Sequence, residues 1–258
     1  KIIIPVHLGG ASCDMKALWR LSKIYGFKII EDASHAIGGS YCNEPIGNCK
    51  YSSMTVFSFH PVKIITTGEG GIVTTNSKSL ANKILNLRSH GITKNPKEFI
   101  YKTKDIWYYE QNDLGFNYRM TDFQAALGSS QLKGLKKIIC RRKKLFEIYK
   151  NKFEEYNIKM QFIPKEVSSS HHLAICLLNN SDMNKHRNIF NYLRESNIGV
   201  QLHYLPVHLH PYYRRLGFRE GDFPEAEKYS RRAISLPIYP QLSLNDQKYV
   251  INKFLKAL

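Results

Sequence analysis

Short apolar segments alternate along this chain with amphipathic segments of helical period, and this alternation constrains the fold more than any other feature. Residues 1–6 (KIIIPV) and 27–30 (FKII) are apolar enough to be buried strands. Between them, Asp14 can cap a helix that Gly26 ends. An Asp side chain accepts hydrogen bonds from the free amides of a helix start, and glycine adopts the left-handed conformation that closes a helix. This β-α-β order predicts an α/β fold with a mostly parallel sheet.

Two residues of opposite charge follow the predicted strands. Asp32 comes after the strand 27–30, and Lys63 comes after the strand 55–59 and before the glycine-rich turn 68–71. Open α/β sheets place ligand-binding groups at the carboxyl ends of their strands, so we expect both side chains at one edge of the sheet. Apolar neighbours disfavour the ammonium form of a lysine and expose its lone pair for nucleophilic attack.

A lysine nucleophile with a carboxylate partner indicates the cofactor pyridoxal 5′-phosphate (PLP). Proteins bind PLP through a lysine Schiff base, with an acidic group facing the pyridinium nitrogen. The alternative is a lysine that extends its ammonium group to solvent from the end of a strand. The neighbouring motifs, described below, favour cofactor binding.

Two domains are predicted. Residues 1–133 form a large domain that binds the cofactor, with a further strand at 71–75 and a helix that Thr121 caps. A long basic helix near 134–156 begins the second domain, residues 134–258, which is a smaller α/β unit. In that domain we expect strands at 173–178 and 198–202 and helices at 184–195 and 246–258.

The chain is strongly basic, since 38 Lys and Arg against 21 Asp and Glu give a formal charge of +17. Such a charge can indicate nucleic-acid binding through phosphate contacts. However, the densest basic stretch, 133–144, carries Leu135, Ile138 and Ile139 at helical spacing, which favours a solvated helix face. No nucleic-acid-binding module accompanies it. We therefore expect no nucleic-acid partner, and the positive field suits an anionic cofactor.

The apolar residues and the cysteines indicate a cytoplasmic protein. No uninterrupted apolar run approaches the roughly 18 residues that a membrane span needs. The five cysteines are an odd number and lack zinc spacing, so reduced thiols are the simplest account. His203, His208 and His210 lie close in sequence, but Pro206 and Pro211 interrupt the regular element that a metal site there would need. We therefore expect no membrane contact and no metal.

Five motifs follow one another through the first half of the chain. They are EDASHA at 31–36, SFHPVKIITTGEGG at 58–71, RSHG at 88–91, LGFNYRM at 114–120 and AALG at 125–128. This series resembles that of the DegT-type nucleotide-sugar aminotransferases. The resemblance implies the fold-type I arrangement of PLP-dependent transferases, similar to aspartate aminotransferase, with a mostly parallel central sheet and a smaller C-terminal α/β domain.

The resemblance also implies roles for five residues. Lys63 matches the Schiff-base lysine that then acts as general base, and Asp32 matches the carboxylate that faces the pyridine nitrogen. His35 matches a residue near the 3′-oxygen of the cofactor, although it could be an ordinary loop histidine. Ser58 matches a donor to the cofactor phosphate. Asn117 matches an asparagine that reaches that phosphate from a second subunit, which implies a homodimer.

The second half of the chain resembles one branch of this family. HYLPVH at 203–208, HPYY at 210–213 and SLPIYP at 235–240 are similar to the branch that aminates C4 of a UDP-linked 4-keto-6-deoxy-N-acetylhexosamine on the way to pseudaminic acid. The implied amino donor is L-glutamate. Arg119, His203, Tyr204 and His208 are candidate contacts to the substrate or donor, and a structural role is the alternative for each. Family dehydratases carry histidine in place of the lysine, so Lys63 argues against that reaction.

Part of the family pattern has no counterpart here. Family members carry, ahead of the segment that matches Lys1, a loop that holds the cofactor phosphate and an aromatic residue that stacks on the ring. We expect that an amino-terminal part of the pattern is missing. The alternative to an enzyme is therefore a catalytically incompetent fragment, or a PLP-fold protein that serves in binding or assembly.

Overall fold

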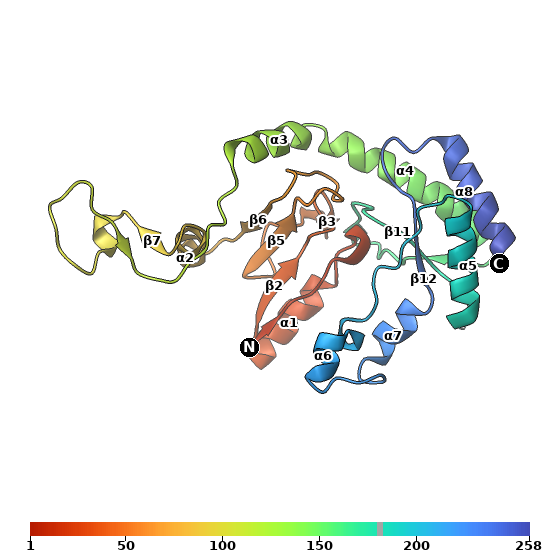
Figure 1. Cartoon of the computed structure of the whole chain (residues 1–258), viewed down its shortest axis with the longest axis horizontal. Coiled ribbons are helices and arrows are strands. Elements are labelled where there is room, and N and C mark those ends of the chain that lie inside the picture. The colour runs from red at the N-terminus through yellow and green to blue at the C-terminus, as the bar shows by residue number, and fades with distance from the viewer. Residues whose placement is uncertain (180–182) are drawn as a thin grey trace. The chain divides into compact units, whose positions relative to one another are not determined.

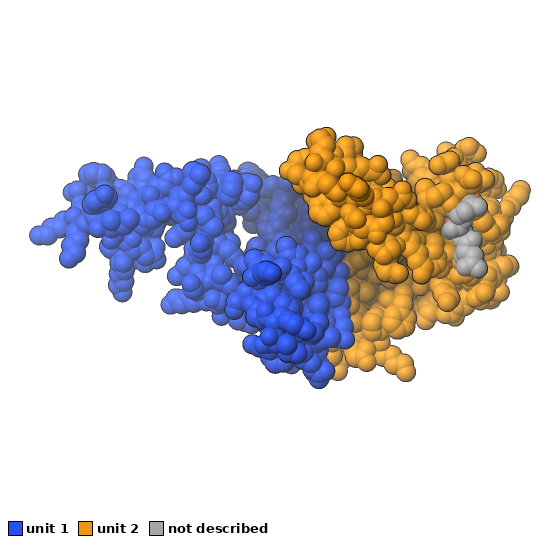
Figure 2. Space-filling view, turned by 90° about the horizontal axis from the view of Figure 1, so that it is seen from below, with its two compact units in different colours: residues 1–7, 13–37, 44–134 blue, residues 8–12, 38–43, 135–258 orange. Residues whose placement is uncertain are grey.

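The computed structural model describes residues 1–179 and 183–258. The chain forms two compact units, which Figure 2 shows in blue and orange. Unit 1 contains residues 1–7, 13–37 and 44–134, and unit 2 contains residues 8–12, 38–43 and 135–258. None of the helices in the described part of the chain is long and apolar enough to cross a membrane.

Unit 1 is built on a four-stranded sheet, whose strands run side by side in Figure 1. The strands are β1 (Ile2–Ile3), β2 (Lys28–Asp32), β5 (Met54–Ser58) and β6 (Gly71–Thr74), in the order β1-β2-β5-β6. The first three strands are parallel, and β6 is antiparallel to β5. The predicted α/β sheet is therefore confirmed. Its edge strands β1 and β6 expose apolar side chains, among them Ile2, Ile3, Ile72 and Val73.

The helices of unit 1 begin at capping side chains. In α1 (Met15–Tyr25), the Asp14 carboxylate accepts from the Ala17 amide at 3.0 Å, and Gly26 closes the helix at φ +69°. The same kind of cap starts α2 (Lys78–Arg88) at Ser77. Thr121 starts α3 (Asp122–Leu132) with a reciprocal pair of bonds to Gln124. The predicted caps at Asp14 and Thr121 are confirmed, because a side-chain acceptor satisfies amides that the helix itself leaves unpaired.

Between α2 and α3, the chain forms a small antiparallel ribbon of β7 (Ile92–Thr93) and β8 (Glu110–Gln111), with a 3-10 turn η2 (Pro96–Glu98). The Glu110 carboxylate accepts from the amides of Ile100 and Tyr101 and from the hydroxyl of Tyr108. One buried carboxylate thus orders a segment that contains few apolar core residues. The remaining strand of this unit is β4 (Glu44–Pro45).

Unit 2 surrounds an antiparallel sheet of β9 (Lys159–Met160), β11 (Ala174–Leu177) and β12 (Ala233–Leu236), with β11 in the middle. The long helices are α4 (Leu135–Glu154), α5 (Met183–Glu195) and α8 (Leu244–Ala257). The shorter elements are η1 (Leu8–Gly10), β3 (Ser40–Tyr41), β10 (Val167–Ser168), η3 (Val207–Leu209), α6 (Pro211–Arg215) and α7 (Pro224–Ser230).

The expected strand at 198–202 is wrong. Within that range, only Gln201 pairs with a strand residue, in an isolated bridge to Ser235. Ile198 and Val200 are nevertheless buried in the core of unit 2. Their alternation therefore reflects burial of a turn that follows α5, where Asn197 adopts φ +57°, rather than pairing in a sheet.

The buried side chain of Arg142 links helix α4 to the loop before β11 and the loop after β12. The Arg142 guanidinium donates to the carbonyl oxygens of His171, His172 and Ile238 at 3.3, 3.2 and 2.9 Å. Burial lowers the pKa of Arg142 to about 10. Carbonyl groups in a core need donors, and one guanidinium supplies several in a fixed plane.

Candidate active site

Two strands of unit 1 end at the same edge of the sheet, and both end on predicted site residues. Asp32 is the last residue of β2 and lies opposite Val56 of the parallel strand β5. The last residue of β5 is Ser58, two positions further along. The Ala33 amide donates to the Val56 carbonyl at 2.8 Å, so the pairing extends past the end of β2. The edge predicted from the sequence therefore carries Asp32 and Ser58.

The carboxylate of Asp32 is half-buried and only partly engaged. Its Oδ1 accepts from the Ser34 amide at 3.0 Å. No other side chain or amide of the described residues donates to this carboxylate, so Oδ2 is available to a ligand. The backbone on both sides is fixed, because the Asp32 amide donates to Pro5 and the Asp32 carbonyl accepts from His7.

Lys63 lies in the loop between β5 and β6. Backbone bonds close this loop on itself: the Lys63 amide donates to His60, and the Phe59 amide donates to Gly70. The neighbours Ile64 and Ile65 are buried, while the Lys63 side chain is half-buried. Burial lowers the pKa of Lys63, and the negative charge of Asp32 opposes that shift without cancelling it. The fold thus places the predicted lysine and carboxylate close enough for their charges to interact, and burial makes the ammonium form of Lys63 less favourable than in a free lysine.

Two further predicted residues lie near these strand ends. His35 follows Asp32 in a tight turn, in which the Ala36 amide donates to the Ala33 carbonyl, and its side chain is buried. The hydroxyl of Ser58 accepts from the His60 amide at 3.4 Å. His60 itself lies 3.7 Å from the Glu69 carboxylate across the same loop.

Asn117 and Arg119 belong to a segment that runs beside the end of α2. The Tyr118 amide donates to Arg88 and the His90 amide donates to Phe116, at 2.9 and 2.8 Å. Both Asn117 and Arg119 are exposed. Within the described parts of the chain, no hydrogen bond or ion pair joins either of them to Asp32 or Lys63, so the structure does not bring these predicted site residues together.

The other three candidate residues belong to unit 2. The His203 ring is 2.8 Å from the hydroxyl of Ser235, and the Tyr204 side chain is exposed. His208 is buried, and its Nε2 lies 2.8 Å from the carboxylate of Glu227. This nitrogen is already engaged inside the protein, so the remaining ring nitrogen is the polar group that His208 could offer to a ligand.

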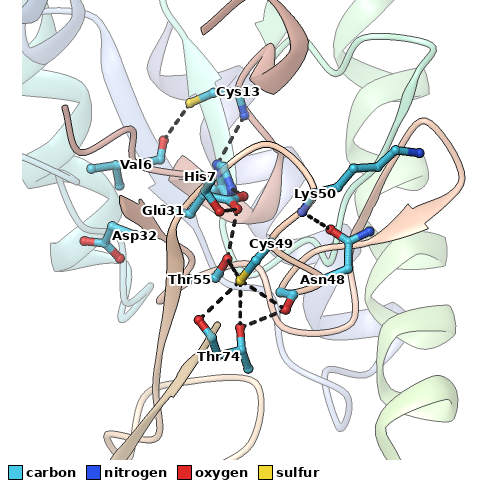
Figure 3. A network of polar contacts seen from close by, with 12 residues as sticks. Val6, His7, Cys13, Glu31, Asp32, Asn48, Cys49, Lys50, Thr55 and Thr74 are labelled. Atoms are coloured by element: carbon cyan, nitrogen blue, oxygen red, sulfur yellow. Dashed lines mark hydrogen bonds and ion pairs between the residues drawn. The ribbon is translucent and has the colours of Figure 1, made fainter. Parts of the chain in front are cut away.

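A buried ion pair between His7 and Glu31 is the part of this region that sequence reasoning missed (Figure 3). The Nε2 of His7 lies 2.8 Å from Glu31, and neither side chain is appreciably exposed. Ser52 and Thr55 also donate to the Glu31 carboxylate. The available signal was positional, since His7 directly follows the first apolar segment and Glu31 directly precedes Asp32.

The pair shifts the pKa of both partners. Burial alone lowers the pKa of His7, but hydrogen bonds to Cys13 and Glu31 and the charge of Glu31 raise it to about 9. The Cys13 hydrogen bond that raises this pKa involves the Cys13 side chain, and it is separate from the bond in which the Cys13 amide donates to Nδ1 of the neutral ring at 3.3 Å. Burial raises the pKa of Glu31, but its bonds to His7, Ser52 and Thr55 outweigh burial, so the net shift is downward.

We expect unit 1 to be most stable in mildly acidic solution. The His7 contribution, about 3 kcal/mol, is fully present below the pKa of about 6.5 in the unfolded chain and is lost as pH rises through about 9. The Glu31 contribution is present above its unfolded pKa and is lost as pH falls through its lowered folded value. Urea unfolding at a series of pH values, followed by tryptophan fluorescence, measures the free energy of unfolding of unit 1, because Trp19 and Trp107 both lie in this unit.

In the His7→Gln variant, the free energy of unfolding should no longer fall between about pH 6.5 and 9. The matched control is His60→Gln, since His60 is exposed and its partner Glu69 is 3.7 Å away. A wild-type unfolding free energy that did not fall across this interval would contradict the raised pKa of His7.

The sequence of this chain matches a known protein family and individual relatives. A model of the DegT/DnrJ/EryC1/StrS aminotransferase family matches residues 1–255. An uncharacterized protein of Methanocaldococcus jannaschii is 40% identical over 100% of this chain and 67% of that protein. The UDP-4-amino-4,6-dideoxy-N-acetyl-beta-L-altrosamine transaminase of Campylobacter jejuni is 36% identical over 99% of this chain and 65% of that protein.

Solved structures agree with the sequence relatives. The putative sugar aminotransferase Spr1654 of Streptococcus pneumoniae, solved in its PLP form, has a TM-score of 0.89 at 29% identity, over 100% of this chain and 69% of that one. This likeness confirms the predicted fold-type I arrangement. The chain spans about two thirds of the length of the curated relatives it matches.

Proposed function

The chain belongs to the DegT/DnrJ/EryC1/StrS aminotransferase family, and on that premise we propose that it is a PLP-dependent nucleotide-sugar aminotransferase. It would move an amino group from L-glutamate to C4 of a UDP-linked 4-keto-6-deoxy-N-acetylhexosamine, in pseudaminic acid or related surface-glycan synthesis. The observation that carries this proposal is the placement of Asp32 at the carboxyl end of β2 and of Lys63 in the loop after β5, where their charges interact. The similarity to the UDP-4-amino-4,6-dideoxy-N-acetyl-beta-L-altrosamine transaminase of Campylobacter jejuni supports the choice of sugar.

The residues at this edge fit the proposed cofactor. Lys63 has an amine whose pKa is lowered, and Asp32 has one carboxylate oxygen available to a pyridine nitrogen. His35 would lie near the 3′-oxygen, Ser58 would donate to the phosphate, and Asn117 would reach the phosphate from a second subunit. When bound, PLP supplies an electron sink that stabilises negative charge on the substrate carbon.

Lys63 would have two tasks in the reaction. Its amine would hold the cofactor covalently, and the same nitrogen would serve as the base that carries a proton away from the substrate carbon. The lowered pKa serves both tasks, because a protonated amine can neither attack nor accept a proton. Closure of the loop by its own backbone bonds would keep this nitrogen near the sheet edge.

Asp32 would hold the ring nitrogen in its protonated form. A carboxylate and a pyridinium ~3 Å apart attract by ~5 kcal/mol at an effective dielectric of ~20, before desolvation costs. Even a quarter of that energy raises the pKa of the ring nitrogen by about one unit. The Ser34 amide orients the carboxylate without occupying its second oxygen.

The sugar nucleotide would be recognised largely by charge and stacking. Arg119 offers a guanidinium that no ion pair of the described residues occupies, and Tyr204 offers an exposed ring. His203 would contact the substrate or the donor carboxylate. His208 would contribute through its free ring nitrogen or by holding its loop against Glu227.

The direct test supplies purified protein with PLP, L-glutamate and the UDP-linked 4-keto sugar. We expect a new UDP-linked amino sugar in the mass spectrum and an equal amount of 2-oxoglutarate. The control omits L-glutamate. Product formation should then stop once any amino group already carried by the cofactor has been transferred. Cofactor binding without any amino transfer would contradict the proposed enzyme and favour the binding or assembly protein.

A homodimer with shared sites completes the proposal. Exposed apolar side chains gather on the segment that carries Asn117, among them Ile106, Trp107, Leu114, Phe116 and Phe123. A groove of about 1180 Å³ lies beside them, lined by β6, α2, Phe116 and residues 118–120. Apolar surface of this extent on a folded unit indicates a protein partner, and closed two-fold dimers are the commonest assembly.

Complementation of two inactive variants tests this dimer. If Asn117 serves the site that contains the Lys63 of the other copy, Lys63→Ala and Asn117→Ala each inactivate every site in a pure dimer. Unfolded and refolded as an equal mixture, they should regain about a quarter of the wild-type activity, because half of the dimers are mixed and each has one intact site. Mixing that restored no activity would place both residues in one subunit's own site.

A further inference from the structure

We propose that His7 and Glu31 are positioning residues, which hold the Asp32 carboxylate at the distance from the cofactor nitrogen at which that nitrogen stays protonated. Neither residue would touch the cofactor. The inference rests on the proposed function, since it assigns a role relative to the bound ring.

The first observation is the saturation of the Glu31 carboxylate. It accepts from His7 through one oxygen and from Ser52 and Thr55 through the other. These donors come from the segment before η1, from the loop before β5 and from β5 itself. Because all the donors surround one buried group, the carboxylate ties the segment 5–7 and strand β5 to the end of β2.

The second observation is the backbone on either side of Asp32. The segment 5–7 brackets this residue, with the Asp32 amide donating to Pro5 at 2.9 Å and the His7 amide donating to Asp32 at 3.0 Å. The His7 ring then reaches back to Glu31, the residue before Asp32. Neighbouring side chains of a strand point to opposite faces of the sheet. The His7–Glu31 pair therefore lies on one face of β2, and the Asp32 side chain points to the other face. Figure 3 shows Asp32 pointing away from the network.

A network of this kind matters to the site because charge interactions depend steeply on distance. At an effective dielectric of ~20, moving a carboxylate from ~3 to ~4 Å from a pyridinium weakens their attraction enough to change the protonation constant about tenfold. Among the described residues, only the Ser34 amide donates a hydrogen bond to the side chain of Asp32. The position of the Asp32 carboxylate therefore depends on the backbone at Asp32, and the His7–Glu31 pair stabilises that backbone.

The network continues on both sides of the ion pair. On one side, the Thr55 hydroxyl lies 3.4 Å from the sulfur of Cys49, which also donates to the Thr74 carbonyl on β6. On the other side, Cys13 contacts the His7 ring. The charge of Lys63 also interacts with that of Asp32. None of these contacts supplies a second hydrogen bond to the Asp32 carboxylate.

The test loads the protein with PLP labelled with nitrogen-15 at the ring and follows the nitrogen resonance against pH. Wild type, Glu31→Gln and Ser52→Ala are compared. The Glu31→Gln variant keeps the shape of the side chain but removes its charge. The Ser52→Ala variant removes a single donor and serves if Glu31→Gln does not fold. Glu44→Gln is the control, because Glu44 is a half-exposed carboxylate of the same unit, paired with Lys50.

We expect the pKa of the ring nitrogen to fall about one unit in Glu31→Gln, a tenfold change, and by less in Ser52→Ala. Glu44→Gln should match wild type. A variant that melts at lower temperature but keeps the wild-type nitrogen titration would overturn the positioning role, because a purely structural pair lowers stability alone. Absence of any PLP attached to Lys63 in the wild type would instead overturn the proposed function, and the inference with it.

Discussion

Replacing Lys63 by alanine should abolish amino transfer while leaving unit 1 folded. We expect a loss of about 10⁴-fold or more, since general base catalysis alone contributes about 10² to 10⁴-fold and covalent attachment is lost as well. The side chain is half-buried and lies outside the core, so its removal costs little stability. Turnover with L-glutamate and the UDP-linked keto sugar measures the effect, and circular dichroism checks the fold.

Borohydride gives an independent measurement of the same residue. In the wild type, reduction should fix the cofactor irreversibly, and peptide mapping should find it on Lys63 alone. The matched control is Lys78→Ala, which removes an exposed lysine at the start of α2 and should change neither result. A reduced adduct on Lys50 or Lys78 would refute the assignment of Lys63.

Changing Asp32 to asparagine should separate cofactor binding from catalysis. The amide is nearly isosteric, and its Oδ1 can still accept from the Ser34 amide, so the fold and part of the PLP affinity should remain. A neutral amide cannot hold the ring nitrogen protonated, and we expect turnover to fall about 100-fold or more. Absorbance of the bound cofactor and turnover, measured on one sample, report the two effects.

Asp105→Asn is the corresponding control. Asp105 is exposed and bonded to Thr103 in the segment between β7 and β8. Its variant should behave as wild type. If Asp32→Asn retained nearly normal turnover with the cofactor bound, the electrostatic role of this carboxylate would have to be abandoned.

Features set by residues close together in sequence could be predicted. The caps at Asp14 and Thr121 depend on bonds over three residues, and a helix start carries that signal in its own sequence. The strands that lead to Asp32 and Lys63 were visible as apolar segments that precede polar residues. The family motifs added the identity of the cofactor, which strand patterns alone leave open.

Features set by contacts between distant residues could not be predicted. The His7–Glu31 pair joins residues 24 positions apart, and no periodic pattern links them. The ribbon of β7 and β8 depends on Glu110, whose carboxylate collects amides nine and ten residues away. Ile198 and Val200 are buried in the core without belonging to a strand. Their spacing in the sequence is the same as that of buried strand residues, and only the tertiary structure distinguishes a strand from a buried turn.

The two outer strands of the unit 1 sheet have a consequence for the behaviour of the chain in solution. Among the described residues, no further strand pairs with the outer edges of β1 and β6, and Ile2 and Ile72 on these strands are 59% and 48% exposed. Such edges are templates for strands of other molecules, so concentrated samples should tend toward open-ended, fibre-like association. Light scattering at rising concentration would then report growing polymers, which have to be distinguished from a closed pair before any stoichiometry is assigned.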